Sequence, residues 1–225
     1  MSAVVYAASV EPLREDGLYA RAFRAASEPR RKKAERYRFD ADRRLCLGSE
    51  LVLRAALRSF GFDGPLEYEY GEHGKPRLKD CPIRFSLSHS GRFVLCAAAE
   101  YELGCDLELL APAPLAVAER FFCPGEYAAL AALPDAEAQS VLFFRYWTLK
   151  ESFLKATGLG LQLPLNSFEI FLSPRLRVEQ TLSPQRFSFA EYSQLPGFRC
   201  AVCAADGSAE AAFTQIELTE LPELR

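Results

Sequence analysis

Two acidic residues, Asp106 and Glu108, are spaced so that they could share a metal ion. A strand is expected over residues 103–109, and period 2 places both carboxylates on one face of it. Two carboxylates side by side repel each other unless a cation lies between them. A hard divalent ion, most simply Mg²⁺, takes oxygen ligands and keeps waters and phosphate oxygens as well. The alternative is two exposed acids on an edge strand.

A second charged group lies in an apolar helix expected over residues 137–157. Trp147, Glu151 and Lys155 are spaced i, i+4 and i+8 and share one face. Lys150 points about 100° away around the helix. Charges on so apolar a helix are costly unless an ionic ligand meets them. Glu151 could supply a third metal oxygen or a base, Lys155 could offset charge on a phosphoryl oxygen, and Lys150 could reach another part of an extended anion. The alternative is a Glu–Lys helix pair worth a few tenths of a kcal/mol.

Ser88 and His89 end a strand that enters a tight turn at Ser90-Gly91. Adjacent residues on a strand face opposite ways, so a Ser–His nucleophile pair is disfavoured. A hydroxyl, an imidazole and turn N–H groups suit phosphate binding better. The alternative is a polar hairpin end with a satisfied histidine.

Residues 30–44 hold eight basic and three acidic side chains, although the whole chain carries a net charge of −3. A solvated helical face is the simpler interpretation of such a run, and an anion site is the alternative.

The composition is that of an ordinary globular protein, with 49% hydrophobic and 25% charged residues among 225. No apolar run approaches the roughly 20 residues that span a bilayer, and the first residues lack the features of a signal peptide. We therefore expect a cytoplasmic protein. The odd number of cysteines, seven, fits a reduced compartment. Cys200 and Cys203 lie in a predicted strand and face opposite ways, which disfavours a zinc site.

The elements that must position these residues follow a repeated plan, helices then strands and again helices then strands. Helices are expected over 11–26, from Pro29, and over 41–60, 115–122, 124–133 and 137–157. Strands are expected over 4–8, 66–70, 83–89, 92–99, 103–109, 167–172, 186–192 and 198–205. The pattern predicts an α+β fold with a seam near residue 104.

Four blocks of sequence together resemble a known family. They are Gly74-Lys-Pro, Ser86-Leu-Ser-His-Ser-Gly, Gly104-Cys-Asp-Leu-Glu and Trp147-Thr-Leu-Lys-Glu-Ser-Phe-Leu-Lys. In order and spacing they are similar to the signature blocks of the Sfp-type 4′-phosphopantetheinyl transferases. The resemblance covers about residues 4–204.

The resemblance implies a fold and an activity. The fold is a pseudo-dimer of two similar α+β halves, here 1–103 and 104–225 in one compact unit, with the site in the cleft between them. The activity is transfer of the 4′-phosphopantetheine group of coenzyme A to a serine of an apo acyl or peptidyl carrier protein, with release of adenosine 3′,5′-bisphosphate. We expect a monomer that binds neither nucleic acid nor membrane.

The resemblance also implies roles for individual residues. Asp106, Glu108 and Glu151 would hold Mg²⁺ against the pyrophosphate of coenzyme A. Glu151, or a water that it orients, would take the proton of the incoming serine, and Lys155 and Lys150 would offset charge on the pyrophosphate.

The remaining roles concern coenzyme A. Lys32, Arg44, Ser88 and His89 would grip its 3′-phosphate, and Lys75 and Pro76 would border its adenine. This chain departs from the family pattern in two places, since Pro29 stands where a lysine is frequent and Leu45 where a small hydroxyl residue is frequent.

Three questions stay open at the level of sequence. Residues 115–122 could form a carrier-binding rim, or could be core. The same acids would serve a Mg²⁺-dependent hydrolase of a pyrophosphate substrate. A non-catalytic module that binds carrier protein is the third possibility.

Overall fold

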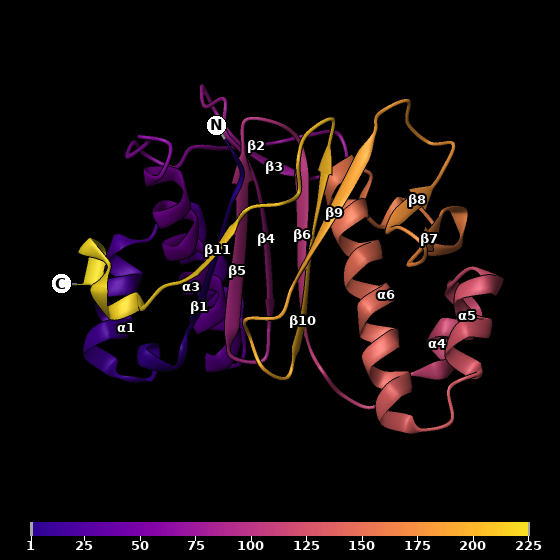
Figure 1. Ribbon diagram of the computed structural model, residues 1–225. Helices are drawn as coiled ribbons and strands as arrows, with labels where there is room; N and C mark the ends of the chain where they lie inside the picture. Colours follow the sequence, from indigo (N-terminus) through magenta and orange to yellow (C-terminus); the bar gives the residue numbers. More distant parts are fainter. Residues whose placement is uncertain (1, 225) are drawn as a thin grey trace.

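The computed structural model describes residues 2–224, without the side chain of Leu161. Two β-sheets lie face to face in the middle of the molecule, and helices cover the outer face of each (Figure 1). The first sheet, with strand order β11-β1-β5-β4, carries the N-terminal helices, and the second, β6-β10-β9, carries the C-terminal ones. The order across the molecule is therefore helices, sheet, sheet, helices.

The N-terminal unit is built around one long helix. Its elements are β1 (Val4–Ser9), η1 (Glu11–Arg14), α1 (Asp16–Ala25), α2 (Glu28–Arg36), α3 (Asp40–Arg58), β2 (Tyr68–Tyr70), β3 (Pro76–Leu78), β4 (Arg84–Ser90) and β5 (Phe93–Ala99). Leu47, Leu51 and Leu57 of α3 are buried, because the apolar stripe of this helix faces the sheet.

The C-terminal unit has a matching long helix. Its elements are β6 (Leu103–Leu109), α4 (Leu115–Phe121), α5 (Pro124–Ala131), α6 (Ala136–Thr157), η2 (Gly160–Gln162), η3 (Leu165–Ser167), β7 (Glu169–Phe171), β8 (Arg177–Glu179), β9 (Phe187–Tyr192) and β10 (Phe198–Ala205). Asp135 caps α6 by accepting a hydrogen bond from the amide of Ala138 at 2.7 Å, and Gly158, with φ of 73°, ends it in the left-handed conformation.

The two units repeat one topology. In each, a first strand leads to the long helix and then to an antiparallel pair whose second strand inserts beside the first, giving the orders β1-β5-β4 and β6-β10-β9. The mixed α+β fold expected from the sequence is confirmed, and the repeat of order accounts for its two similar halves. The proposed division into residues 1–103 and 104–225 stays a prediction, because residues 212–224 of the second range pack with the first unit.

The last residues return to the first unit. The strand β11 (Ala212–Gln215) pairs in parallel with β1, and η4 (Leu218–Glu220) and η5 (Pro222–Leu224) pack beside α1 and α3 (Figure 1). The sequence analysis missed β11, because four residues at a sheet edge carry too little alternation to be recognised.

The expected helix over 11–26 is also wrong in part. It is divided into η1 and α1 at Glu15, whose backbone is extended with φ of −77° and ψ of 124°. Pro12 lies in the first turn of η1, where the missing amide hydrogen of proline costs nothing because it would have no partner within the helix. The helices expected over 41–60 and 137–157 are confirmed to within two residues.

Alternate residues of β6 face opposite sides of its sheet. Leu103, Cys105 and Leu107 of β6 face the first sheet, whereas Gly104, Asp106 and Glu108 face the opposite way, toward α6. The predicted orientation of the two acids is therefore confirmed.

Gly104 sets the distance between β6 and α6. A Cβ at this position would overlap the carbonyl oxygen of Ser152 and the amide nitrogen of Ala156, and would lie 2.7 Å from Cβ of Lys155. We expect Gly104→Ala to destabilise the protein by about 1–3 kcal/mol, because backbone of α6 has to move. Urea unfolding measures this. Gly17→Ala is the control, since its Cβ would meet only the flexible carboxylate of Glu15, and an equal loss in both variants would contradict the prediction.

Candidate active site

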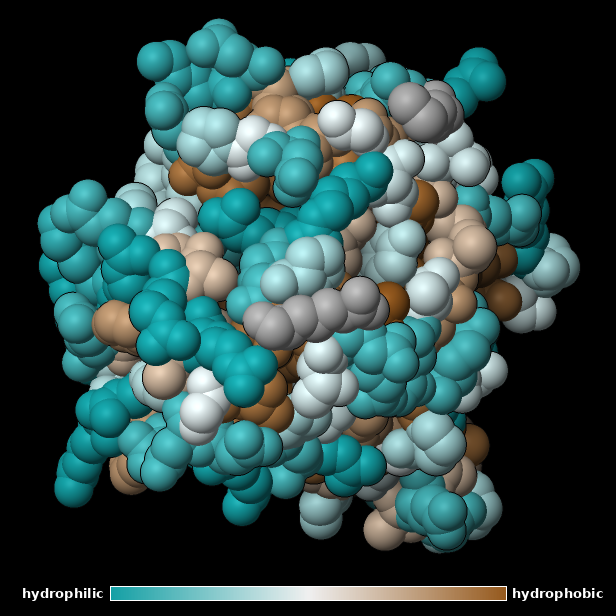
Figure 2. All heavy atoms as spheres, turned by 90° about the vertical axis from the view of Figure 1, so that its left-hand side faces the viewer, coloured by the Kyte–Doolittle hydropathy of each residue, from teal (hydrophilic) through white to brown (hydrophobic). Residues whose placement is uncertain are grey.

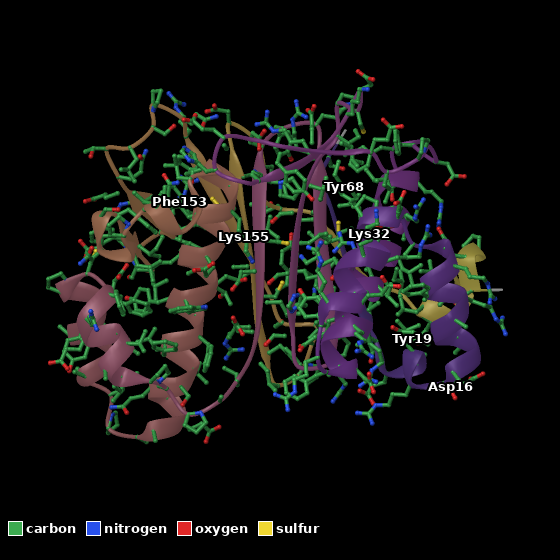
Figure 3. The ribbon with its side chains drawn as sticks, turned by 180° about the vertical axis from the view of Figure 1, so that it is seen from behind. Asp16, Tyr19, Lys32, Tyr68, Phe153 and Lys155 are labelled. Carbon is green, nitrogen blue, oxygen red and sulfur yellow. The ribbon has the colours of Figure 1, made fainter. Side chains whose placement is uncertain are left out.

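The acids of β6 and one face of α6 line the same pocket. Its volume is about 320 Å³, and it lies where β4, β6 and α6 meet. The lining side chains are Leu87, Ser88, His89, Asp106, Glu108, Trp147, Glu151 and Lys155. Seen from behind, Lys155 extends from α6 toward the central strands, while Phe153 lies on the other side of that helix (Figure 3). The helical spacing that grouped Trp147, Glu151 and Lys155 is thus confirmed.

Lys155 is fixed at the floor of this pocket. Its Nζ lies 2.6 Å from Oδ1 of Asp106, 3.1 Å from the carbonyl oxygen of Cys105 and 3.2 Å from Oγ of Ser88. Burial by itself would lower the pKa of Lys155, but the charge and hydrogen bond of Asp106, together with Cys105 and Glu151, outweigh this and raise it. The side chain therefore holds a permanent positive charge at a defined place.

The two glutamates crowd the same space. Burial, followed by repulsion from Asp106, raises the pKa of Glu151 and also that of Glu108. Lys155 opposes both shifts without cancelling them. A bound cation would relieve this repulsion.

Asp106 has the clearest unmet requirement. The residue is 3% exposed, Oδ1 is bound by Lys155 and Ser88, and Oδ2 is buried without a hydrogen-bond partner among residues 2–224. A buried carboxylate oxygen without a partner is costly and points to a missing cation or donor. Mg²⁺ fits this donor set, because it commonly takes one or two carboxylates and fills its other positions with water and phosphate oxygens.

The three acids do not form a finished metal cluster. Among residues 2–224, no three His, Cys, Asp or Glu side chains are grouped closely enough to hold a metal ion as they stand. Asp106, Glu108 and Glu151 share the pocket, but their convergence on one ion stays a prediction.

A second pocket adjoins the first through Leu87 and His89 and has a volume of about 290 Å³. Its cationic side chains are Arg30 and Lys33 of α2, which stand with His89 along its wall. Desolvation in the pocket lowers the pKa of His89, and the charges of Lys155 and Lys33 lower it further. Through Arg30 and Lys33, the basic run 30–44 thus contributes to a pocket next to the one that holds the acids.

The structure does not place Lys32 at either pocket, and its contact with the 3′-phosphate stays a prediction. Its side chain is 64% exposed and pairs at 2.6 Å with Glu28 on the solvent side of α2, away from both pockets. In Figure 3 it lies among the helices of the N-terminal unit, across the central strands from Lys155. Arg44 lines neither pocket either. Much of the basic run is thus the solvated face that a charge run usually forms, and the outer face in Figure 2 is mostly hydrophilic.

Nor does the structure place Lys150 where coenzyme A could contact it. Its side chain is fully buried on the far side of α6, and its Nζ lies 2.8 Å from Oε1 of Glu126. The same Nζ donates to the carbonyl oxygens of Leu165 and Phe168, both at 2.9 Å. The ionic partner that justifies this charge is a carboxylate of the protein, which the sequence analysis missed.

Ser88 and Lys75 have their polar atoms occupied by the protein. The hydroxyl of Ser88 donates to Asp106 and accepts from the amide of Leu107, so the structure does not support a direct grip on a phosphate. Nζ of Lys75 lies 2.7 Å from Oε2 of Glu102 and also donates to two carbonyl oxygens. The stem of Lys75 and the ring of Pro76 line a third pocket of about 270 Å³.

The three pockets share lining residues. Leu87 lines all of them, Lys155 is shared by the first and third, and Pro76 by the second and third. Together they present acidic side chains at β6 and α6, basic side chains at α2, and an apolar wall at β3. An elongated ligand with a polyanionic part matches this distribution.

Known proteins decide the family. The profile of the 4′-phosphopantetheinyl transferase superfamily matches residues 102–203. The 4′-phosphopantetheinyl transferase Sfp of Bacillus subtilis is 36% identical over 200 residues, which is 87% of this chain and 89% of that protein. This chain belongs to that superfamily.

Other 4′-phosphopantetheinyl transferases agree with this assignment. The protein psf-1 of Bacillus pumilus is 37% identical over 77% of this chain and 76% of its own length, and HetI of Nostoc is 40% identical over 63% of each chain. The holo-(acyl-carrier-protein) synthase of Bacillus anthracis in complex with CoA (3′,5′-ADP) shares 14% identity over 48% of this chain and 97% of that chain, with a TM-score of 0.38, too low to add to the case. The activity of this 4′-phosphopantetheinyl transferase is transfer of a phosphopantetheine group to a carrier protein, as the resemblance implied.

No helix among the residues that the structure describes is both long and apolar enough to cross a membrane.

Proposed function

We propose that this phosphopantetheinyl transferase works with Mg²⁺ held by Asp106, Glu108 and Glu151, and releases adenosine 3′,5′-bisphosphate from coenzyme A. The observation that carries the proposal is the buried, unpartnered Oδ2 of Asp106 in a pocket shared with the two glutamates. When bound, the ion would withdraw charge from the reacting phosphorus and stabilise the leaving phosphate. Residues of the chain supply the remaining steps.

Lys155 and Glu151 stand on one face of α6 and have complementary tasks. Lys155, held charged by Asp106, offsets the negative charge of the pyrophosphate and of the phosphoryl group in transit. The hydroxyl oxygen of the carrier serine forms a bond to the phosphorus next to the pantetheine, and Glu151 accepts the proton of that hydroxyl. The bond between this phosphorus and the bridging oxygen of the pyrophosphate breaks, and adenosine 3′,5′-bisphosphate leaves.

The nucleotide end of coenzyme A is assigned to the other two pockets. Lys33 and His89 would hold the 3′-phosphate in the second pocket, in place of Lys32 and Arg44, beside Arg30, whose Nε is paired with the buried Glu50. Pro76 and the stem of Lys75 would border the adenine in the third. Lys33 makes no hydrogen bond or ion pair among the described residues, so its ammonium group is available to a ligand.

The exchange of Lys32 for Lys33 is directly testable. We expect Lys33→Ala to raise KM for coenzyme A about tenfold, because a charge-assisted hydrogen bond of ~1.4 kcal/mol to the 3′-phosphate is lost. KM for 3′-dephospho-coenzyme A should not change. Lys32→Ala is the matched control, with the same charge removed one residue away. A larger effect of Lys32→Ala, or an equal effect on both substrates, would contradict the assignment.

The carrier protein would approach beside the acidic end of the site. Phe121 of α4 is 42% exposed and the guanidinium of Arg120 lies 5.1 Å from its ring centroid, whereas Ala118 and Phe122 are buried. The rim proposed at 115–122 is thus reduced to the outer side of a short helix. A monomer in the cytoplasm is the setting we propose.

One assay tests the reaction against its alternatives. Coenzyme A labelled in its phosphopantetheine arm is incubated with Mg²⁺ and a panel of apo carrier proteins. Label on carrier protein supports transfer, and the kcat/KM values across the panel identify the preferred carrier. Label released only as free phosphopantetheine would indicate a hydrolase, and no turnover of any carrier would indicate a binding module.

A further inference from the structure

Three serines of β4 connect the two sheets by a regular pattern of hydrogen bonds. Ser86, Ser88 and Ser90 alternate along the strand and so share one face. Their Oγ atoms accept hydrogen bonds from the backbone amides of Cys105, Leu107 and Leu109 at 3.0, 3.3 and 3.0 Å, respectively. The backbone amides on the edge of β6 that faces β4 are therefore paired with serine hydroxyls, and not with the backbone of a neighbouring strand.

Two of the three serines also donate to an acid of the site. The hydroxyl of Ser88 donates to Oδ1 of Asp106 at 2.8 Å, and that of Ser90 donates to Oε2 of Glu108 at 2.9 Å. In each case the acid directly precedes the residue whose amide the serine accepts. For Ser86 the corresponding residue is Gly104, which has no side chain, so Ser86 makes the connecting bond alone.

Of the two serines that bind an acid, Ser90 has the simpler set of side-chain contacts. Ser88 contacts Lys155 as well as Asp106, whereas the side-chain partners of Ser90 among residues 2–224 are Glu108 and the amide of Leu109. The hydroxyl of Ser90 is thus held by β6 while it donates to Glu108 at 2.9 Å. A hydroxyl fixed in this way orients the carboxylate that it binds.

We propose that Ser90 is a positioning residue, which holds the carboxylate of Glu108 beside Asp106 in the orientation needed to bind Mg²⁺. The proposal rests on the proposed function, since it takes Glu108 as a metal ligand. Groups that orient metal ligands through hydrogen bonds change metal affinity by about 10–100-fold when removed. Loss of one hydrogen bond between a serine of β4 and a backbone amide of β6 would not by itself lower the affinity for the metal.

Metal binding tests the proposal without turnover. Mn²⁺ is titrated into the full-length protein saturated with coenzyme A, without carrier protein, and free Mn²⁺ is followed by electron paramagnetic resonance. We expect Ser90→Ala to raise the Kd for Mn²⁺ about tenfold. Ser90→Thr keeps the hydroxyl and should restore an affinity within about twofold of the unchanged protein, which is well inside the tenfold effect.

Ser86→Ala is the matched control, because it removes the same type of bond to β6 from the same face of the same strand. Its Kd for Mn²⁺ should stay at the value of the unchanged protein. An unchanged Kd in Ser90→Ala, or an equal rise in Ser86→Ala, would overturn the role of Ser90 and leave the metal site in place. Failure of the unchanged protein to bind Mn²⁺ would overturn both the role of Ser90 and the proposed metal.

Discussion

Replacing Glu151 by alanine is expected to lower kcat at least about a hundredfold, the range given for a positioned proton acceptor. Glu151 lines the acidic pocket together with Lys155, one helical turn further along α6. Without its carboxylate, the proton of the carrier serine has no acceptor on this wall, and the metal loses one proposed ligand. Single-turnover transfer to apo carrier protein measures the loss.

Glu137→Ala provides the control for Glu151→Ala. Glu137 lies in the first turn of the same helix and is exposed, far from the pocket. It should leave kcat and the far-ultraviolet circular dichroism spectrum unchanged. Asp106→Ala should lose activity to a similar degree. Normal carrier modification by both Glu151→Ala and Asp106→Ala would show that this pocket is not the catalytic site.

Replacing Lys150 by alanine is expected to destabilise the fold by about 3–5 kcal/mol, because it leaves the carboxylate of Glu126 buried without its cation. Both side chains are at most 1% exposed, and Oε1 of Glu126 also accepts from the amide of Ile170 at 2.8 Å. Desolvation lowers the pKa of Lys150 and raises that of Glu126, because burial disfavours both charged forms, and the charge of each group opposes the shift of the other. Urea unfolding measures the difference.

The control for Lys150→Ala is a more exposed ion pair on the same helix. Arg145 binds Glu191 through two hydrogen bonds of 2.8 and 2.7 Å, with about a third of each side chain exposed. Arg145→Ala should therefore cost about 1 kcal/mol or less. Equal losses for the two variants would show that the Lys150 pair is not buried as described.

A further variant separates a structural Lys150 from one that binds substrate. Lys150→Met with Glu126→Gln removes both charges and keeps a similar shape, and it should recover part of the lost stability, since the carbonyl oxygens of Leu165 and Phe168 still lose their donor. KM for coenzyme A should then equal that of the unchanged protein. A raised KM in the folded double variant would restore Lys150 to the substrate site.

The sequence by itself determined which residues share a face. Period 2 grouped Asp106 with Glu108, and helical spacing grouped Trp147, Glu151 and Lys155, because both periods are properties of a local backbone conformation. The order of helices and strands predicted the α+β fold for the same reason. These predictions needed no knowledge of what lies opposite each face.

Only the tertiary structure decided what each charged face meets. Lys150 meets Glu126, 24 positions earlier in the chain, and no local pattern predicts that pairing. The basic helix α2 could present either Lys32 or Lys33, and Ala34, its one fully buried residue, fixes its rotation so that Arg30 and Lys33 face the site. The serines of β4 meet the acids of β6 because two sheets join at these edges. Local spacing is set by the backbone, whereas partners depend on packing between segments far apart in sequence, and such packing decides whether a charge is solvated, paired within the protein, or left for a ligand.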